Sequence, residues 1–548
     1  MKKMIRDPSC FARDEYDLLV VGGGIYGICA AWHAARRGLS VAVIDKRDFC
    51  GETSANPLKI VHGGFRYMQH ANFSRIRKSS HERKVLMQMA PHLVDPIHFL
   101  IPTYGYGMQG KAILRLGLFA YNLVVFDRNR GLTDRQKHIP WGEILSREDV
   151  ERQFPELDPT GLTGGVAFVD GQMYSPPRLA YSYLRSAVDA GAGAANYLEA
   201  TGFLRDGQRV AGVHAQDLLN GDEFDIRARV VMNTTGPWIP KLLRQLDIRL
   251  KKPLQYTKDL YLVVDRVLSD RYALAIPGME KDPDAIVSRG ARHYFVIPWR
   301  GRSLVGSSHE IYEGSPDEFE VTEDDVSALL GEVNKACPPL ALTRDNIVML
   351  NYGLVPAGDY YNDTSRIIDH SRDHKIDDLI TITGVRWTTS RGVAGQAVDL
   401  AMAKIGKAPV AASASSPSLY GGDIEIFPDF LREAGRQCPE QMDECAVNNL
   451  LRHHGSQYRD VLNYVDENPA LVATLGESPV LQAAVVHAVR DEMAQKLGDV
   501  VFRRTDLGTA GHPGEAALRD CAELMAAELG WDPARIDQEL DEIKQEFP

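Results

Sequence analysis

A glycine-rich turn near the start of the chain has the spacing that binds the diphosphate of a dinucleotide. An apolar strand predicted over Tyr16–Val21 runs directly into Gly22, Gly24 and Gly27, which fit the pattern GxGxxG, and a helical pattern follows. In such a turn the first glycine permits the tight bend, the second lets the backbone approach a diphosphate, and the third lets helix and strand pack closely. The N-terminus of the helix adds N–H groups and partial positive charge, so the segment predicts dinucleotide binding.

An acidic residue follows at the position that selects among dinucleotides. A second strand, predicted over Ser40–Ile44, delivers Asp45, eighteen residues after Gly27. A carboxylate there accepts hydrogen bonds from an adenosine ribose with a free 2′-hydroxyl, which favours FAD or NAD over NADP. A plain NAD domain would continue with regular strand–helix units, whereas this chain enters a polar stretch of small residues over 51–56. Such a stretch can run along an extended cofactor with its backbone, which favours FAD.

Further motifs recur in order along nearly the whole chain. They are Tyr16–Gly27, Lys59–Met68, Met89–Pro102, Ala228–Trp238, Phe295–Ser308, Ser371–His374, Thr383–Thr389 and His487–Gly508. This set resembles the FAD-dependent glycerol-3-phosphate dehydrogenases, a branch of the D-amino-acid-oxidase-like flavoproteins. The resemblance implies an FAD cofactor and hydride transfer from a CH–OH carbon to the flavin, while a protein base takes the hydroxyl proton.

The resemblance also implies an α/β fold in three parts. A Rossmann-type FAD-binding domain is expected from residues 1–95, 160–250 and 355–406, an inserted antiparallel-sheet substrate-binding domain from 96–159 and 251–354, a linker from 407–423, and a C-terminal helical domain from 424–548. Local patterns agree, because the apolar run Ala228–Met232 predicts a strand that returns the chain to the first sheet. Asp532 and Pro533 supply an N-cap and a first-turn proline for a last helix.

The same resemblance assigns residues to the cofactor. They are Gly22, Gly24, Ile25, Tyr26, Gly27, Asp45, Lys46, Thr53, Ser54, Lys59, His62, Gly63, Gly64, Thr235, Gly236, Trp238, Gly384, Arg386, Trp387 and Thr388. These residues fall in segments that are far apart in the sequence. The fold must therefore bring them together around one cavity.

The predicted catalytic groups are Tyr261, Arg386 and His62. Tyr261 stands where the family has a histidine near the reacting hydroxyl, and Arg386 replaces a lysine. A free tyrosine, with a pKa of about 10, is a poor base, but it can donate a hydrogen bond or act as a base if Arg386 lowers its pKa. His62 is the alternative base, or it positions the cofactor through its backbone. His293 and His309 are weaker candidates.

The predicted substrate-binding positions depart from the family. Asn56 and Val355 stand where two arginines hold the substrate, whereas Arg372 is retained and Lys59 offers a further cation. Loss of two charged hydrogen bonds costs about 3–6 kcal/mol. We therefore expect an FAD-dependent oxidoreductase that acts on a polyol, sugar or hydroxy acid rather than on simple glycerol 3-phosphate. The alternatives are a true glycerol-3-phosphate dehydrogenase with a rearranged phosphate site, an amine oxidase, and a catalytically silent flavin-binding protein.

Composition and charge disfavour several other classes of protein. The 62 basic and 74 acidic side chains give a net charge of −12, which is unsuited to general nucleic-acid binding. Seven cysteines without CxxC spacing fit a reducing compartment, and the chain carries no metal-binding motif. No uninterrupted apolar run reaches about 18 residues, so we expect no transmembrane helix and a cytoplasmic protein.

The expected partners are a small-molecule substrate and an electron acceptor, which can be a quinone, oxygen or a partner protein. The segment Met108–Arg130 combines apolar side chains with Lys111, Arg115 and Arg128. It predicts either a core helix with solvated ends or a helix on a membrane surface, which would make the protein peripheral on the inner face of the cell membrane. The sequence leaves a homodimer open.

Overall fold

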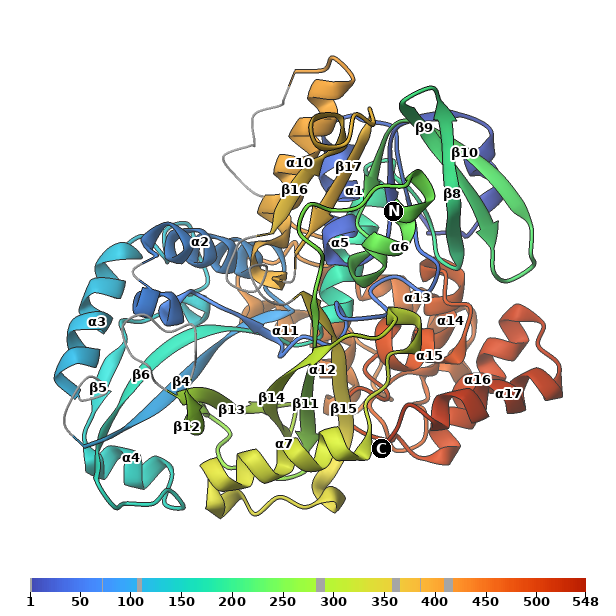
Figure 1. Ribbon diagram of the computed structural model, residues 1–548. Helices are drawn as coiled ribbons and strands as arrows, with labels where there is room; N and C mark the ends of the chain where they lie inside the picture. The colour runs from blue at the N-terminus through green and yellow to red at the C-terminus, as the bar shows by residue number, and fades with distance from the viewer. Residues whose placement is uncertain are drawn as a thin grey trace.

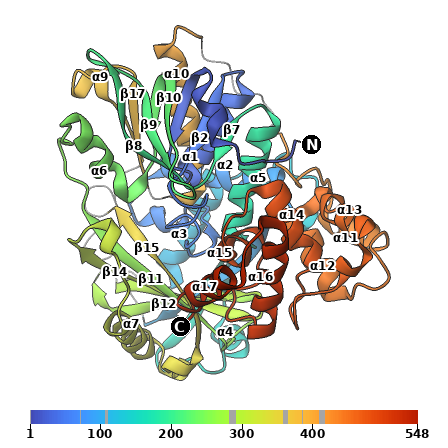
Figure 2. The ribbon, with the colours of Figure 1, turned by 90° about the vertical axis from the view of Figure 1, so that its right-hand side faces the viewer.

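Two β-sheets and a C-terminal helical domain make up the protein (Figure 1, Figure 2). The structure is a computed structural model that describes residues 2–70, 72–105, 111–281, 291–356, 365–384, 386–408 and 417–548. The chain crosses between the two sheets several times, so each sheet combines strands that are far apart in the sequence. The predicted α/β fold is confirmed, and the last part of the chain is helical as expected.

The first sheet has the strand before the glycine turn at its centre. Its order is β16–β17–β10–β1–β2–β7, and β1 runs parallel to both of its neighbours, while β9 and β8 extend from β10. The bounds are β1 (Glu15–Val21), β2 (Val41–Ile44), β7 (Gly193–Ala195), β8 (Leu198–Asp206), β9 (Arg209–Asp217), β10 (Glu223–Asn233), β16 (Arg366–Asp369) and β17 (Leu379–Thr383).

Both faces of this sheet are covered, as is usual for parallel strands. Leu18 and Val20 pack against α1 (Ile25–Arg36), α5 (Pro176–Asp189) and α10 (Ser390–Lys404). Leu19 and Val21 pack on the opposite side with residues of β8, β9 and α6 (Ile239–Leu243). The predicted strand is therefore buried on both sides, and it carries the glycine turn at its carboxyl end.

The second sheet is mostly antiparallel. Its order is β15–β11–β14–β13–β12–β4–β6–β3, with β5 also on β6, and within the described residues only β12 and β4 pair in parallel. The bounds are β3 (Ile60–Val61), β4 (Val94–Tyr104), β5 (Glu143–Leu145), β6 (Leu162–Met173), β11 (Tyr256–Val264), β12 (Tyr272–Lys281), β13 (Ala291–Trp299), β14 (Arg302–Tyr312) and β15 (Ile347–Pro356). Helix α7 (Glu323–Ala336) packs Val326 and Val333 against one face. The other face carries Phe99, Phe168 and Tyr261.

The pairing of β6 differs from the predicted domain boundaries. Residues 160–250 were assigned to the FAD-binding domain, but β6 pairs with β4 in the second sheet, from Val94 opposite Met173 to Tyr104 opposite Leu162. Ile60–Val61 joins the same sheet through β6. A run of apolar residues predicts a strand, but the sheet that the strand joins depends on distant partners, which the local pattern does not reveal.

The C-terminal domain consists of helices around a separate apolar core. The bounds are α11 (Phe427–Gly435), α12 (Glu444–His454), α13 (Arg459–Glu467), α14 (Gln482–Glu492), α15 (Leu497–Asp499), α16 (Glu515–Leu529) and α17 (Pro533–Lys544). The predicted cap is confirmed, because the Asp532 side chain accepts a hydrogen bond from the Arg535 backbone at 2.8 Å. Part of the predicted linker lies outside the described residues, and its last residues are packed, since Leu419 and Tyr420 are buried.

The remaining helices lie around the second sheet and at the ends of the first. They are α2 (Phe73–Met89), α3 (Lys111–Val124), α4 (Arg147–Gln153) and α9 (His370–Asp373). Helices α2 and α3 lie side by side at one edge of the molecule (Figure 1). Among the described residues, none of the helices combines the length and the apolar character that a membrane crossing requires.

Candidate active site

The glycine turn has the tight geometry that its sequence predicts. Gly22 has a φ of +105°, and a Cβ built there would lie 2.7 Å from the carbonyl of Thr234, the residue that follows the neighbouring strand β10. A Cβ at Gly27 would lie 1.9 Å from the Gly22 oxygen, so only glycine lets α1 approach β1 this closely. Helix α1 begins at Ile25, and its N-cap is Gly24, which offers no capping side chain. The helix therefore presents its positive end to the space beside the turn.

Asp45 lies next to this turn at the end of β2. Its carboxylate accepts hydrogen bonds from the backbone N–H of Gly23 at 2.6 Å and of Arg47 at 2.8 Å. Burial raises the pKa of Asp45 to about 7. The glycine turn and the residue two positions after Asp45 thus hold its carboxylate at the end of β2. There it can accept hydrogen bonds from a ribose.

One large cavity begins at Asp45 and the glycine turn and ends against the second sheet. Its volume is about 1030 Å³, at the upper end of the range of cavities that bind small molecules and cofactors. Seventeen of the predicted cofactor residues line it: Gly22, Gly24, Ile25, Tyr26, Asp45, Lys46, Thr53, Ser54, His62, Gly64, Thr235, Gly236, Trp238, Gly384, Arg386, Trp387 and Thr388. Gly27, Lys59 and Gly63 lie behind this lining.

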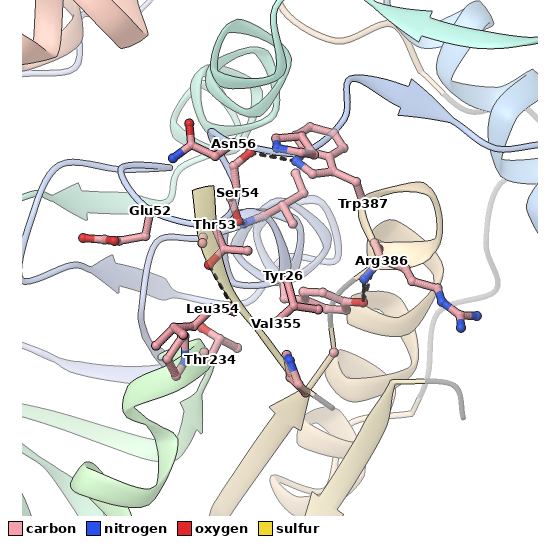
Figure 3. Close-up of a pocket in the computed structure, with 18 of the residues that line it drawn as sticks. Tyr26, Glu52, Thr53, Ser54, Asn56, Thr234, Leu354, Val355, Arg386 and Trp387 are labelled. Atoms are coloured by element: carbon pink, nitrogen blue, oxygen red, sulfur yellow. Dashed lines mark hydrogen bonds between the residues drawn. The ribbon is translucent and has the colours of Figure 1, made fainter. Parts of the chain in front are cut away.

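Three segments of the cavity wall are tied together by hydrogen bonds (Figure 3). The backbone N–H of Arg386 donates to the hydroxyl of Tyr26 at 3.2 Å, and the indole of Trp387 donates to the Ser54 carbonyl at 2.9 Å. The Thr53 hydroxyl donates to the Leu354 carbonyl at 3.1 Å. The turn after β17, the stretch after Asp45 and the end of β15 therefore meet, as the prediction requires.

Tyr261 lines the cavity, but its hydroxyl is hydrogen-bonded to Lys59 and Pro57 behind the cavity wall. The hydroxyl donates to the Pro57 carbonyl and lies 3.0 Å from Lys59 Nζ. Lys59 Nζ also donates to Asn351 Oδ1 at 3.3 Å. Its side chain therefore lies behind the cavity wall, and not beside the cofactor and substrate as the sequence predicts. Burial lowers the pKa of Lys59 to about 7 and raises that of Tyr261 well above its usual value. Tyr261 is thus arranged as a hydrogen-bond donor rather than as a base.

The predicted base His62 lines the cavity with a half-exposed ring. Its backbone N–H donates to the Thr388 hydroxyl at 3.2 Å, and its Nδ1 lies 3.5 Å from Asp170 Oδ2. Asp170 is already bonded by the buried Arg83 at 2.5 Å. The backbone contact supports the alternative in which His62 positions the cofactor, while its role in catalysis stays a prediction.

The predicted substrate residues fall into two groups. Asn56 and Val355 line the cavity, Asn56 after the stretch that contains Ser54 and Val355 at the end of β15 (Figure 3). Arg372 lies outside it, with its side chain 82% exposed and 3.6 Å from Asp369. The prediction that Arg372 binds substrate is therefore corrected. The register of β16 and β17 explains its position, because Asp369, just before Arg372, pairs with Ile380 at the end of the hairpin farthest from Gly384.

A positively charged group that the sequence analysis missed approaches Tyr67. The guanidinium of Arg75, in the first turn of α2, lies 4.0 Å from the centroid of the Tyr67 ring, and that of Arg386 lies 5.4 Å from it. All three residues line the cavity. Arg75 is one of several basic residues in α2, so its sequence context gave no sign that this one turns inward. The result is a concentration of positive charge suited to an anion.

The missed residues also include Ser307 and Asp259, which line the cavity beside His309. His309 was predicted to be only a weak candidate, because one histidine in an exposed-looking strand carries little signal. The signal that could have found it is the alternation of β14, which places residues 307 and 309 on one face.

Comparisons with known proteins agree with this geometry. The family model "FAD dependent oxidoreductase" matches residues 17–400, and the model "C-terminal domain of alpha-glycerophosphate oxidase" matches residues 413–536. A protein of Synechocystis sp. named glycerol-3-phosphate dehydrogenase is 30% identical over 97% of this chain and 96% of its own length. The chain belongs to the FAD-dependent glycerol-3-phosphate dehydrogenase family. Glycerol-3-phosphate dehydrogenase 2 of Mycobacterium tuberculosis is also 30% identical, over 96% of this chain and 87% of its own.

A solved structure of this family extends the likeness to three dimensions. The glycerol-3-phosphate dehydrogenase of Bacillus halodurans, solved in complex with FAD, has a TM-score of 0.78 and 25% identity, covering 98% of this chain and 95% of its own. The protein is thus an FAD-dependent oxidoreductase. The glycine turn, the carboxylate of Asp45 and the volume of the cavity all fit this cofactor.

The cavity divides the chemical tasks of such an enzyme among its own residues. FAD supplies the acceptor for a hydride when it is bound. The glycine turn and Asp45 would hold the cofactor, and the face of β11 and β14 carries groups that can exchange a proton. Arg75 and Arg386 can orient an anionic substrate. Phe99, Phe168 and Phe295 also line the cavity and limit the access of water to it.

Proposed function

We propose that the protein oxidises the secondary alcohol of glycerol 3-phosphate to a ketone, with a phosphate site built from different residues than the family uses. The observation that carries this proposal is the pair Arg75 and Arg386, which approach one ring inside the cofactor cavity. Two guanidinium groups can bind a phosphate through charge-assisted hydrogen bonds. The names of the full-length relatives point to the same substrate.

The charge around Val355 supports this location of the phosphate. Thr257 hydrogen bonds to both Asp259 Oδ1 at 2.9 Å and the Val355 carbonyl at 3.3 Å, so a carboxylate lies beside the position where the family has an arginine. A carboxylate repels a phosphate, whereas Arg75 and Arg386 attract one. Each charged hydrogen bond contributes about 1.5–3 kcal/mol, so Arg75, together with Arg386 in place of the family's lysine, can offset part of the loss of two arginines. The relatives favour this alternative over a substrate without phosphate.

An anaerobic titration of the purified FAD-loaded protein tests the proposal. Glycerol 3-phosphate should remove the visible absorbance of the oxidised flavin, while glycerol, lactate and amino acids at equal concentration should leave it unchanged. Reduction by glycerol as fast as by glycerol 3-phosphate would show that the phosphate is not recognised. Reduction by an amino acid alone would favour an amine oxidase, and no reduction by any compound would favour a silent flavoprotein.

We also propose that the protein contacts a membrane surface through α3. Leu116, Phe119 and Leu123 of α3 and Phe126 in the turn after it follow helical spacing, and each exposes more than half of its surface. The interpretation of this segment as a core helix does not account for so much exposed apolar surface. Exposed cations accompany it, including Arg115 and Arg130. An anionic lipid surface matches both features, and it would bring the protein to a quinone, one of the three acceptors that the sequence leaves open.

A further inference from the structure

Three polar side chains from two neighbouring strands form a hydrogen-bonded chain in the wall of the cavity. Asp259 of β11 lies directly opposite His309 of β14 in the antiparallel pairing. Asp259 Oδ1 is 2.7 Å from His309 Nδ1, and His309 Nε2 is 3.1 Å from the Ser307 hydroxyl. All three residues line the cavity that fits FAD. The imidazole is therefore held at one nitrogen by a carboxylate, while its other nitrogen lies next to a hydroxyl.

This geometry resembles the way in which proteins prepare a histidine as a base. A carboxylate that accepts the Nδ1–H fixes the tautomer in which Nε2 carries the lone pair, and it stabilises the imidazolium that forms on proton uptake. The side chains of His309 and Asp259 are 18% and 23% exposed, so the pair is partly shielded and yet open to the cavity.

We propose that His309 is the base that accepts the hydroxyl proton of the substrate, and that Asp259 is its positioning residue. The assignment rests on the proposed function. The O–H bond of the substrate breaks and its proton goes to Nε2 of His309. The C–H bond of the same carbon breaks and its electron pair leaves as hydride to FAD, which is reduced by two electrons. A C=O bond forms, so atoms and charges balance.

The other candidate bases are less well placed for this step. The Tyr261 hydroxyl donates to the Pro57 carbonyl and accepts from Lys59, so its proton and one of its lone pairs are already engaged. The ring of His62 is 48% exposed, and its carboxylate neighbour Asp170 is held by Arg83. Among these groups, His309 combines a partly shielded ring, a closely bonded carboxylate and a position in the cavity wall.

A second histidine–carboxylate pair in the same protein provides a matched control. His214 of β9 lies opposite Asp225 of β10, and its Nδ1 is also 2.7 Å from the carboxylate. These side chains are 53% and 55% exposed and lie on the β8–β9–β10 extension of the first sheet. The two pairs share strand geometry and distance, so a comparison between them isolates the contribution of the cavity.

The test compares His309→Ala with His214→Ala as FAD-loaded proteins. We expect the flavin reduction rate with glycerol 3-phosphate to fall by about 10²–10⁴-fold in His309→Ala and to stay unchanged in His214→Ala. FAD content, melting temperature and the affinity for inorganic phosphate, followed by the flavin spectrum, should match the wild type in both. Added imidazole should restore part of the rate in His309→Ala only. Asp259→Asn should lower kcat without raising KM, and Asp259→Glu should restore part of it.

The outcomes separate this assignment from the proposed function. If the wild type is reduced and His309→Ala is reduced equally fast, His309 is not the base although the proposed function stands. If His309→Ala loses FAD or melts earlier and imidazole restores nothing, the residue is structural and the assignment is overturned. If no alcohol reduces the wild type, the proposed function fails and the assignment fails with it.

Discussion

At the scale of single residues, the guanidinium groups of Arg75 and Arg386 approach the Tyr67 ring in the cavity wall. Arg75→Gln and Arg386→Gln each remove one guanidinium from the phosphate site that we propose. Each loss of about 1.5–3 kcal/mol should raise the KM for glycerol 3-phosphate about 10- to 150-fold. Steady-state kinetics measures this change. Arg372→Gln serves as the control, since its side chain is 82% exposed outside the cavity. An equal rise in KM for Arg372→Gln would contradict the corrected position of that arginine.

Lys59 gives a prediction about pH and stability. Burial lowers its pKa from 10.5 to about 7 in the folded protein. Between these two values the unfolded chain binds more protons at Lys59 than the folded chain does, so its contribution to stability rises with pH. The slope is at most about 1.4 kcal/mol per pH unit. Urea unfolding of Lys59→Met and the wild type from pH 7 to 10 should show the wild type gaining stability relative to the variant. A constant difference would show that Lys59 stays charged.

The groups that we propose for catalysis are harder to find in the sequence than the groups of the glycine turn. Gly22, Gly27 and Asp45 belong to a local pattern whose physical requirements can be read from spacing alone. His309 depends on Asp259, fifty residues earlier, and the two meet only because β11 and β14 pair in one register. Lys59 is a cation in the sequence, but its side chain bonds to Tyr261 and Asn351 and does not line the cavity. Sequence spacing is enough to predict the role of a local turn. A site that is formed between two strands can be predicted only when the pairing of those strands is known.

At the scale of elements, a buried carboxylate joins the loop after β2 to the C-terminal domain. Asp48, three residues after Asp45, is bonded by Arg504 at 2.8 Å, by Arg503 at 2.5 Å and by Asn196 at 2.8 Å. Asp48 and Arg504 are almost completely buried. The helical domain therefore braces the loop that follows Asp45, the residue predicted to bind the ribose.

Arg504→Met tests this brace. It leaves a buried carboxylate with less compensation, which should lower the free energy of unfolding by about 3–5 kcal/mol and weaken the retention of FAD. Urea unfolding and the flavin content after gel filtration measure the two effects. Arg490→Met is the matched control, because Arg490 pairs with Glu528 on the surface and should contribute less than about 1 kcal/mol. Equal stability of the two variants would argue that the brace is not needed.

The same elements show the limits of local prediction. The strand Tyr16–Val21 and the cap Asp532 were predicted because each depends on a few neighbouring residues. The placement of β6 in the second sheet depends on β4, about sixty residues away, and was not predicted. Part of the predicted linker proved to be packed, since Leu419 donates its backbone N–H to the Met89 carbonyl. A segment rich in Ala, Ser and Gly is predicted to be flexible. That composition does not indicate which surface of the folded protein the segment packs against.

At the scale of the whole molecule, α3 and the C-terminal domain lie on opposite sides (Figure 1). The helical domain braces the first sheet, while Leu116, Phe119 and Leu123 of α3 are each more than half exposed. This arrangement leaves one side of the molecule free to lie on a membrane. The apolar face and its exposed cations would then act together, since apolar burial holds the helix and charge attracts it to anionic lipid.

The double variant Phe119→Ser/Phe126→Ser tests the membrane contact. Burial of each phenylalanine contributes about 1.5–3 kcal/mol, so the variant should bind vesicles of phosphatidylglycerol and phosphatidylcholine at least about a hundredfold more weakly in a sedimentation assay. Ile311→Ser is the matched control, because Ile311 is 75% exposed but lies on β14.

High salt should weaken wild-type binding as it screens the cations. Turnover with a soluble dye as acceptor should be the same in all three proteins, since α3 contributes no residue to the chemistry. A wild type that stays in the supernatant at low salt would leave the exposed face of α3 without this role.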